Sequence, residues 1–127
     1  MSIIEFPYTL HRGFLLPIIP VTIFGHRVWV FVDSGAAFTI LSVYDVKRME
    51  IEWRSGRQQM IMVGDGDFIP VYFHDLSIQI EKWQVVAPVG FSERLGVGFN
   101  LLGRKGIFDQ FQVCFNDHIC KVTFQKI

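Results

Sequence analysis

An aspartate interrupts a strongly apolar stretch of the chain, VFVDSGAAFTILS, at residues 30–42. An ionised carboxylate is too costly to bury alone, so Asp33 must end its strand at a surface, meet a cation or share a proton with another acid. No cation lies beside it in the sequence. Ser34, Gly35 and Ala36 follow, and such small residues allow a tight turn and the close approach of another group. Asp-Ser-Gly is also a common turn tripeptide, so the stretch predicts either an acid-base site or an ordinary turn.

Other residues that bind metals or act as nucleophiles form no recognisable site in the sequence. Cys114, His118 and Cys120 surround one expected turn, but their spacing matches no usual zinc pattern and a fourth ligand is missing. The stretch 64–67 (GDGD) lacks the further oxygen ligands and the terminal Glu of a calcium loop. The histidines are scattered, with no Ser or Cys context that would make a catalytic triad. We therefore expect no metal and no cofactor.

The length and composition predict one compact domain over residues 1–127. The formal net charge is zero, and no run of Lys or Arg is present. Because nothing in this pattern would neutralise a phosphate backbone, we expect no nucleic-acid partner. The apolar stretches have the length of strands and fall well short of the roughly 20 residues of a membrane-spanning helix. We therefore expect no association with a membrane.

The N-terminal residues and the cysteines bear on the compartment. The segment MSIIEFPYTLHRG lacks the early positive charge and the long apolar segment of a signal peptide. Cys114 and Cys120 are the only cysteines of the chain. Such a pair is more typical of two free thiols than of a disulfide framework. We expect a reducing, cytoplasmic location.

The periodicity along the chain is mostly that of short strands separated by turns. The expected strands are residues 18–24, 27–32, 59–63, 68–73, 77–86, 112–115 and 120–124. The first two form a hairpin around Gly25-His26, and the next two form a hairpin around residues 64–67. A short helix is predicted after Ser42, because Asp45 three residues later completes a capping-box pattern. Many strands and little helix predict an all-β protein with a closed or partly closed barrel.

Three segments, taken in order, resemble the motifs of the retropepsins, the retroviral-type aspartic proteases. The stretch from Phe31 to Ala36, FVDSGA, resembles their active-site signature, and TILS at residues 39–42 continues it as in cellular and prokaryotic members. MVGDGDFIPV at residues 62–71 resembles the glycine-rich flap hairpin. NLLGR at residues 100–104 resembles the motif that precedes their C-terminal helix. The tail from residue 106 to residue 113 is similar to the bacterial and archaeal branch of the family.

The resemblance implies a mostly β chain with one or two short helices, the acid-protease fold with one lobe per chain. It implies an active-site loop at 33–36, a flap at about 61–71 and a C-terminal helix region at about 102–110. Retropepsins are homodimers in which each chain contributes one aspartate, so Asp33 would be half of a catalytic dyad with Asp33 of a second copy. The dyad would hold one proton and activate a water for peptide hydrolysis. Terminal strands would contribute to the dimer interface.

The resemblance also implies roles for the residues around the dyad. Ser34, Gly35 and Ala36 would support the active-site loop, and Gly103 and Arg104 would be structural. An extended peptide would lie under the flap as an added strand. The substrate-binding residues would then be Ala37, Phe38, Val63, Gly64, Asp65, Gly66, Asp67 and Phe68.

The sequence departs from the retroviral pattern in two places. The acidic residue that pairs with the arginine of the Gly-Arg motif is absent, so Arg104 would need Asp109, Glu93, the other chain or substrate. Asp65 and Asp67 make the tip of the flap acidic, which predicts a preference for basic or neutral peptides. Because of these departures, a second hypothesis is a catalytically weak or inactive module that dimerises or holds peptides. Two aromatic side chains also allow two interpretations, an apolar subsite or the barrel core: Phe38 and Phe68.

Overall fold

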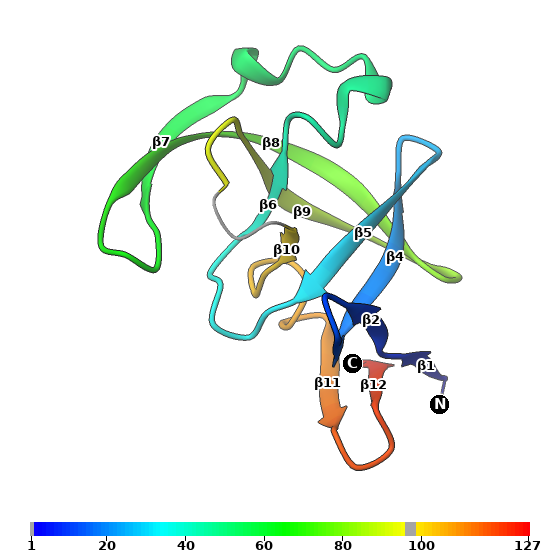
Figure 1. Cartoon of the computed structure of the whole chain (residues 1–127). Helices are drawn as coiled ribbons and strands as arrows, with labels where there is room; N and C mark the ends of the chain where they lie inside the picture. The colour runs from blue at the N-terminus through cyan, green and yellow to red at the C-terminus, as the bar shows by residue number, and fades with distance from the viewer. Residues whose placement is uncertain (1, 96–98) are drawn as a thin grey trace.

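The computed structural model describes residues 2–95 and 99–127 (Figure 1). Its elements are twelve strands and two single turns of 3-10 helix. The strands are β1 (Ile3–Pro7), β2 (Thr9–His11), β3 (Phe14–Leu16), β4 (Ile18–Ile23), β5 (His26–Val32), β6 (Thr39–Ser42), β7 (Arg57–Met62), β8 (Phe68–Ile80), β9 (Trp83–Ser92), β10 (Asn100–Leu102), β11 (Phe111–Asn116) and β12 (Lys121–Lys126). The 3-10 turns are η1 (Lys47–Met49) and η2 (Trp53–Ser55). Among the described residues, no helix is long and apolar enough to cross a membrane.

The main sheet has seven strands in the order β4-β5-β10-β6-β9-β8-β7. Thr22 of β4 also pairs with Gln79 of β8, so the sheet curls round until β4 and β8 meet at this one pair. Strand β7 lies beyond this closure and pairs with β8 alone, which leaves the β7–β8 hairpin reaching out from the body (Figure 1). The all-β fold expected from the sequence is confirmed, with a ring of strands that is only partly closed.

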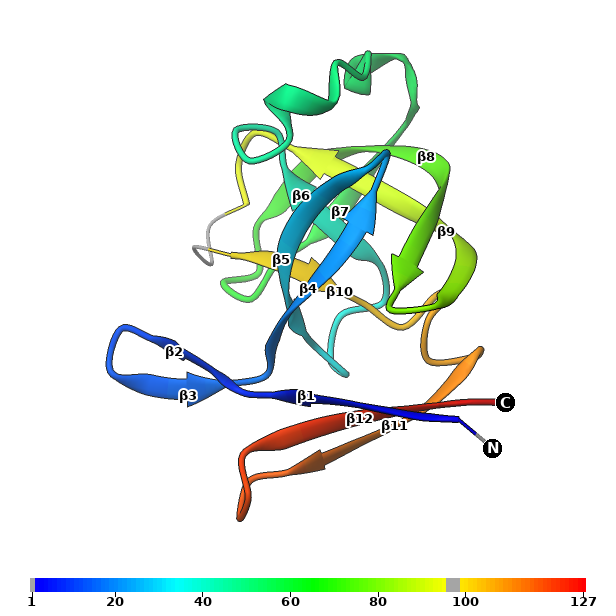
Figure 2. The ribbon, with the colours of Figure 1, turned by 90° about the vertical axis from the view of Figure 1, so that its right-hand side faces the viewer.

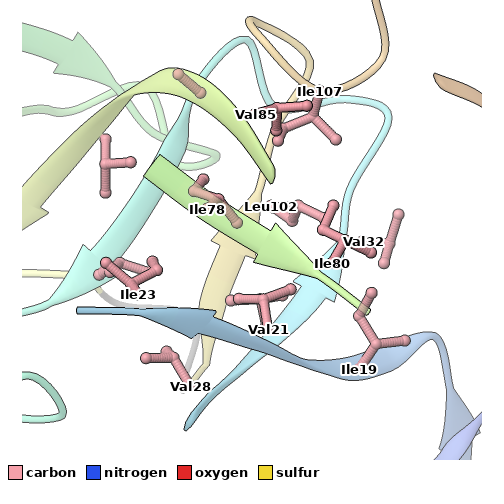
Figure 3. Packing of buried hydrophobic residues seen from close by; sticks show 14 of the residues in the cluster. Ile19, Val21, Ile23, Val28, Val32, Ile78, Ile80, Val85, Leu102 and Ile107 are labelled. Carbon is pink, nitrogen blue, oxygen red and sulfur yellow. The ribbon is translucent and has the colours of Figure 1, made fainter. Parts of the chain in front are cut away.

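Strand β8 supplies two hydrophobic clusters from opposite faces. Its buried residues alternate as Ile69, Val71 and Phe73, and the alternation then changes phase to Leu76, Ile78 and Ile80. Since successive side chains of a strand point to opposite faces, the two halves of β8 serve different interiors. The second half joins the main core with residues of β4, β5 and β9 (Figure 3). The first half joins a smaller cluster with Ile40 of β6.

The chain ends form a separate sheet with the order β1-β12-β11 beneath the ring (Figure 2). Phe124 lies at its centre, with the rings of Phe6 and Phe111 edge-on at 5.8 Å and 5.7 Å. Tyr8 follows β1, and its hydroxyl donates a hydrogen bond of 2.7 Å to Asp117. Burial, together with this bond, raises the pKa of Tyr8 to about 12. The phenol therefore keeps its proton at neutral pH and ties β1 to the β11–β12 turn.

Neither helix that the sequence suggested is present in the described residues. After Ser42 only the 3-10 turn η1 forms, because the Asp45 carboxylate accepts a bond of 3.2 Å from Asn100 instead of completing a capping box. Over residues 102–110 the chain forms successive turns rather than a helix. Gly106 has φ +80° there, a left-handed conformation that interrupts an α-helix. A tertiary hydrogen bond thus accounts for the first missing helix, and one glycine accounts for the second.

Two strand boundaries also differ from the sequence expectation. The stretch 77–86 is not one strand, because β8 ends at Ile80 and β9 begins at Trp83. Glu81 makes that turn with φ 51°, a conformation that sequence rules assign to Gly or Asn. In the first hairpin the turn lies at Phe24-Gly25, one residue earlier than expected. The β7–β8 and β11–β12 hairpins form where they were expected, and Cys114 and Cys120 are free.

Candidate active site

Asp33 stands in a turn directly after the buried strand β5. The Asp33 N–H donates to the carbonyl of Leu102 at 3.0 Å, which extends the parallel pairing of β5 with β10. Its carboxylate accepts a bond of 2.8 Å from the Gly35 N–H. A Cβ at residue 35 would lie only 3.2 Å from this carboxylate oxygen. Glycine therefore leaves the carboxylate room, and the side chain is held in a half-buried position at the end of the strand.

The segment around Gly103 holds the rest of the loop from below. The N–H groups of Arg104 and Lys105 each donate a bond of 2.9 Å, to the carbonyls of Ala36 and Ala37. Gly103 itself is buried, and its N–H donates to the hydroxyl of Thr39 at 3.1 Å. A side chain at residue 103 would overlap the backbone of Phe38. These contacts fix the direction of Asp33 from a segment distant in the sequence.

Thr39→Val tests the hydrogen bond that anchors Gly103. The Thr39 side chain is fully buried, so a valine of similar shape leaves the Gly103 N–H without an acceptor. We expect the free energy of unfolding to fall by about 2–3 kcal/mol, measured by denaturant titration. Thr39→Ser is the matched control, because it keeps the hydroxyl and loses one methyl group, about 1 kcal/mol. A valine variant as stable as the serine variant would contradict this role.

Residues 61–71, here called the flap, form the outer end of the β7–β8 hairpin. The Val63 N–H donates to the Asp67 carbonyl at 2.8 Å, and the Gly66 N–H donates to the Val63 carbonyl at 2.9 Å. The Asp65 carboxylate accepts a bond of 2.9 Å from the Asp67 N–H. Gly66 has φ +89°, so the turn depends on a glycine at its tip. Asp65 therefore shapes the turn as well as charging it.

A cleft of about 720 Å³ separates the Asp33 loop from the flap. Nine of the residues suggested by the sequence line it: Asp33, Gly35, Ala36, Ala37, Phe38, Val63, Gly64, Asp65 and Asp67. Seven more residues contribute: Ile40, Ile61, Met62, Ile69, Arg94, Leu95 and Leu101. Many of the apolar lining residues also belong to the smaller hydrophobic cluster beneath β8. The cleft is thus the open side of a hydrophobic core, with one carboxylate on its floor.

Several residues suggested by the sequence lie outside the cleft lining. Ser34 is exposed, and Gly103 is buried beneath the loop. Phe68 is 53% exposed and belongs neither to the lining nor to the core. Phe38, in contrast, serves both, because it lines the cleft and its ring lies 4.9 Å from that of Phe73. Gly66 shapes the turn without lining the cleft.

Arg104 has no ion pair within the part of the chain that the structure describes. Glu93, one of its expected partners, pairs instead with Arg54 at 3.1 Å. Arg104 is exposed, and its structural contribution there is the backbone bond to Ala36. The Arg104 side chain is thus exposed to solvent beside the Asp33 loop.

Two residues of the cleft lining could not be predicted from the sequence, because only the pairing of distant strands brings them there. Arg94 and Leu95 follow β9, which runs parallel to β6 beside the Asp33 loop. No local pattern marks them. Ile61 and Ile69 were recoverable, since each lies two residues along its strand from another inward residue of the hairpin. The described lining therefore contains one cationic side chain, that of Arg94, and three carboxylates.

Comparisons with known proteins bear on this arrangement. Residues 19–104 match a family model described as "Aspartyl protease". None of the curated proteins compared matches this chain. A solved structure titled as a retropepsin-like aspartic protease from Rickettsia conorii is 16% identical with a TM-score of 0.69, over 97% of this chain and 91% of that one. EIAV protease, solved with an inhibitor, is 17% identical with a TM-score of 0.58, over 76% of this chain and 88% of that one. The fold is therefore retropepsin-like, as the motifs predicted.

Proposed function

This chain belongs to the aspartyl protease family, and from that premise we propose that it is an endopeptidase whose catalytic dyad is formed by Asp33 of two identical copies. One observation carries the proposal. A single carboxylate stands on the floor of an apolar cleft, in a loop braced by backbone hydrogen bonds, and the two other carboxylates of the described lining belong to the flap. One carboxyl group cannot act as base and acid in the same step, so a second copy supplies the other.

The dyad performs peptide hydrolysis by moving protons. Two carboxyl groups in close contact cannot both be ionised, so the pair holds one proton. The ionised member takes a proton from a water, whose oxygen attacks the carbonyl carbon of the peptide. The protonated member donates to the carbonyl oxygen, and a tetrahedral diol forms. Its collapse breaks the C–N bond as a proton passes to the leaving amine, which yields a free carboxyl group and a free amine.

The cleft suits an extended peptide. Its apolar floor is the uncovered side of the smaller hydrophobic cluster, so an apolar substrate side chain completes a core that the chain leaves open. The flap lies over the opposite side, and its hairpin provides backbone groups for an added strand. Movement of the flap would admit the peptide and then exclude water from the reaction.

The test is cleavage of casein from about pH 3 to about pH 8, with the molecular mass of the protein measured in the same buffers. Cleavage that depends on Asp33 in a dimer supports the proposal. A dimer that binds unstructured peptides but cuts none, over this range and in a peptide-library screen, would favour the catalytically inactive module. The unpaired guanidinium of Arg104 in the described structure is the observation that favours this second function.

The charges of the cleft predict a substrate preference. Asp65 and Asp67 lie on the flap side of the lining. We expect the double variant Asp65→Asn/Asp67→Asn to lower the ratio of kcat/KM for lysine-containing over glutamate-containing peptides by about fivefold. Asparagine at residue 65 can still accept the turn's hydrogen bond, so the flap should keep its shape. The complementary control is Arg94→Gln, which removes a positive charge from the same cleft.

Arg94→Gln should move the same ratio upward, because it removes the cation that faces acidic side chains. The peptides would share one sequence except for a single charged position on either side of the cleaved bond. Ratios that stay unchanged in both variants would show that the flap charges do not select substrates.

A further inference from the structure

The hairpin of β2 and β3, residues 9–16, carries three exposed apolar side chains. We call it the arm. Leu10 and Leu15 pair directly across its two strands, so both side chains lie on one face. They are 68% and 52% exposed. Phe14 on the opposite face is 69% exposed. Within residues 2–95 and 99–127, no further strand pairs with the two strands of the arm, and the arm projects from the body (Figure 2).

The arm is firmly joined to the body at its base, although its outer face is bare. The Thr9 hydroxyl donates a bond of 2.7 Å to the carbonyl of Ile18. The ring of His11 packs edge-on against Phe99 at 5.4 Å, and Phe99 stacks on Phe31 at 4.9 Å. His11 thus contacts the body, Phe14 on the same face is exposed, and Leu10 and Leu15 lie on the other face. A two-stranded hairpin is only marginally stable in water by itself. An exposed apolar face on such a hairpin is typical of a surface that binds a partner.

The root of the arm lies beside the active-site loop. The Val32 N–H donates a bond of 2.9 Å to the carbonyl of Pro17, the residue after β3, and Val32 immediately precedes Asp33. In a dimer whose two Asp33 side chains share a proton, the loops of both copies meet at the symmetry axis. The root of each arm is then close to that axis. The free face of the arm is continuous with the surface at which the second copy must dock.

We infer that the arm is a dimerisation element, whose Leu10–Leu15 face packs against a second copy of this chain. This inference rests on the proposed dyad, because the position of Asp33 identifies the occupant as a second copy. The arm adds exposed apolar area next to the Asp33 loop of each copy. It thereby couples assembly of the dimer to formation of the catalytic site, and dilution should lower activity and mass together.

The test is the dimer dissociation constant of Leu10→Ser/Leu15→Ser, measured by analytical ultracentrifugation over a wide concentration range. We expect this constant to rise by about 100-fold, because both copies lose the contact. Val86→Ser/Phe24→Ser is the matched control, since these side chains are 69% and 57% exposed and lie on β9 and in the β4–β5 turn, outside the terminal sheet. Circular dichroism of each variant would show whether the fold is kept. Amide hydrogen exchange of the arm should slow at dimer-forming concentrations and quicken on dilution.

The outcomes separate this inference from the proposed function. If Leu10→Ser/Leu15→Ser remains a dimer with an unchanged dissociation constant, the arm is not at the interface, whereas Asp33-dependent cleavage would still stand. An unchanged dimer with a raised KM for casein would make the arm a substrate-docking surface and would overturn the inference. A wild-type chain that stays monomeric and cleaves casein would overturn both the arm and the dyad. Loss of dimer and activity in the arm variant, both restored at high concentration, would support the inference.

Discussion

Asp33→Asn is expected to lower kcat/KM for casein cleavage by at least about 1,000-fold. An amide cannot take the proton of the attacking water, and the substitution removes both members of the dyad at once, because the two copies are identical. The amide oxygen of asparagine can still accept the bond of 2.8 Å from the Gly35 N–H, so the loop should keep its shape.

Asp75→Asn is the matched control for this experiment. Asp75 is an exposed residue of β8 outside the cleft lining, so its replacement removes the same charge without touching the site. Its kcat/KM should equal that of the wild type. Asp33→Asn should sediment as a dimer at the same concentrations as the wild type. Wild-type rates in an Asp33→Asn dimer would show that this carboxylate does not carry the reaction.

The position of the Asp33 loop at the end of a strand could be predicted from the sequence because its signal is local. An aspartate followed by small residues after an apolar strand restricts both the turn and what can approach it. The flap is similarly local, with glycines and aspartates between two alternating strands. Arg94 and Leu95 carry no such signal. They reach the cleft because β9 runs parallel to β6, and that pairing joins segments about fifty residues apart.

The fold shows the same division between local and long-range causes. The hairpin around residues 24–25 could be recognised, since its strands and its glycine are contiguous. Strand β10 could not, because its three residues become a strand only by pairing with β5 and β6. The helix expected after Ser42 failed for a related reason. Its capping residue Asp45 is bound to Asn100, which belongs to β10. Tertiary hydrogen bonds override a local capping pattern when the partner is buried.

The exposed apolar side chains of the arm could not be predicted from the sequence. Leu10, Phe14 and Leu15 read as ordinary apolar residues in a short segment, and the sequence gives no reason to place them outside the core. The structure pairs Leu10 with Leu15 in a two-stranded ribbon, with Phe14 on its other face, and no further strand of the described chain pairs with this ribbon. Under the proposed dyad, exposed apolar residues near the Asp33 loop are informative, because the second copy would dock with a surface of its own.

Gly103→Ala is expected to lower the free energy of unfolding by about 3 kcal/mol and kcat/KM by about 100-fold. The added Cβ would overlap the backbone of Phe38, and a backbone atom cannot move aside by changing rotamer. The strain must instead shift residues 36–38 away from Gly103, which loosens the bonds from Arg104 and Lys105 to the loop. Asp33 begins the same loop, so a displacement of the order of an ångström reaches the dyad. Denaturant titration and casein cleavage measure the two effects.

Gly64→Ala is the control for the stability measurement. It also replaces a glycine by alanine, but without the overlap with the backbone of a neighbouring residue. Nothing lies within 4 Å of a Cβ at residue 64, so stability should stay within about 0.5 kcal/mol of the wild type. If Gly103→Ala were equally benign, the loop would be able to yield without cost, and the contacts beneath it would not be what aims Asp33. If Gly103→Ala lost stability but kept full activity, the dyad would hold its geometry independently of this segment. The joint loss predicted here ties the stability of the fold and the placement of the carboxylate to one close backbone contact.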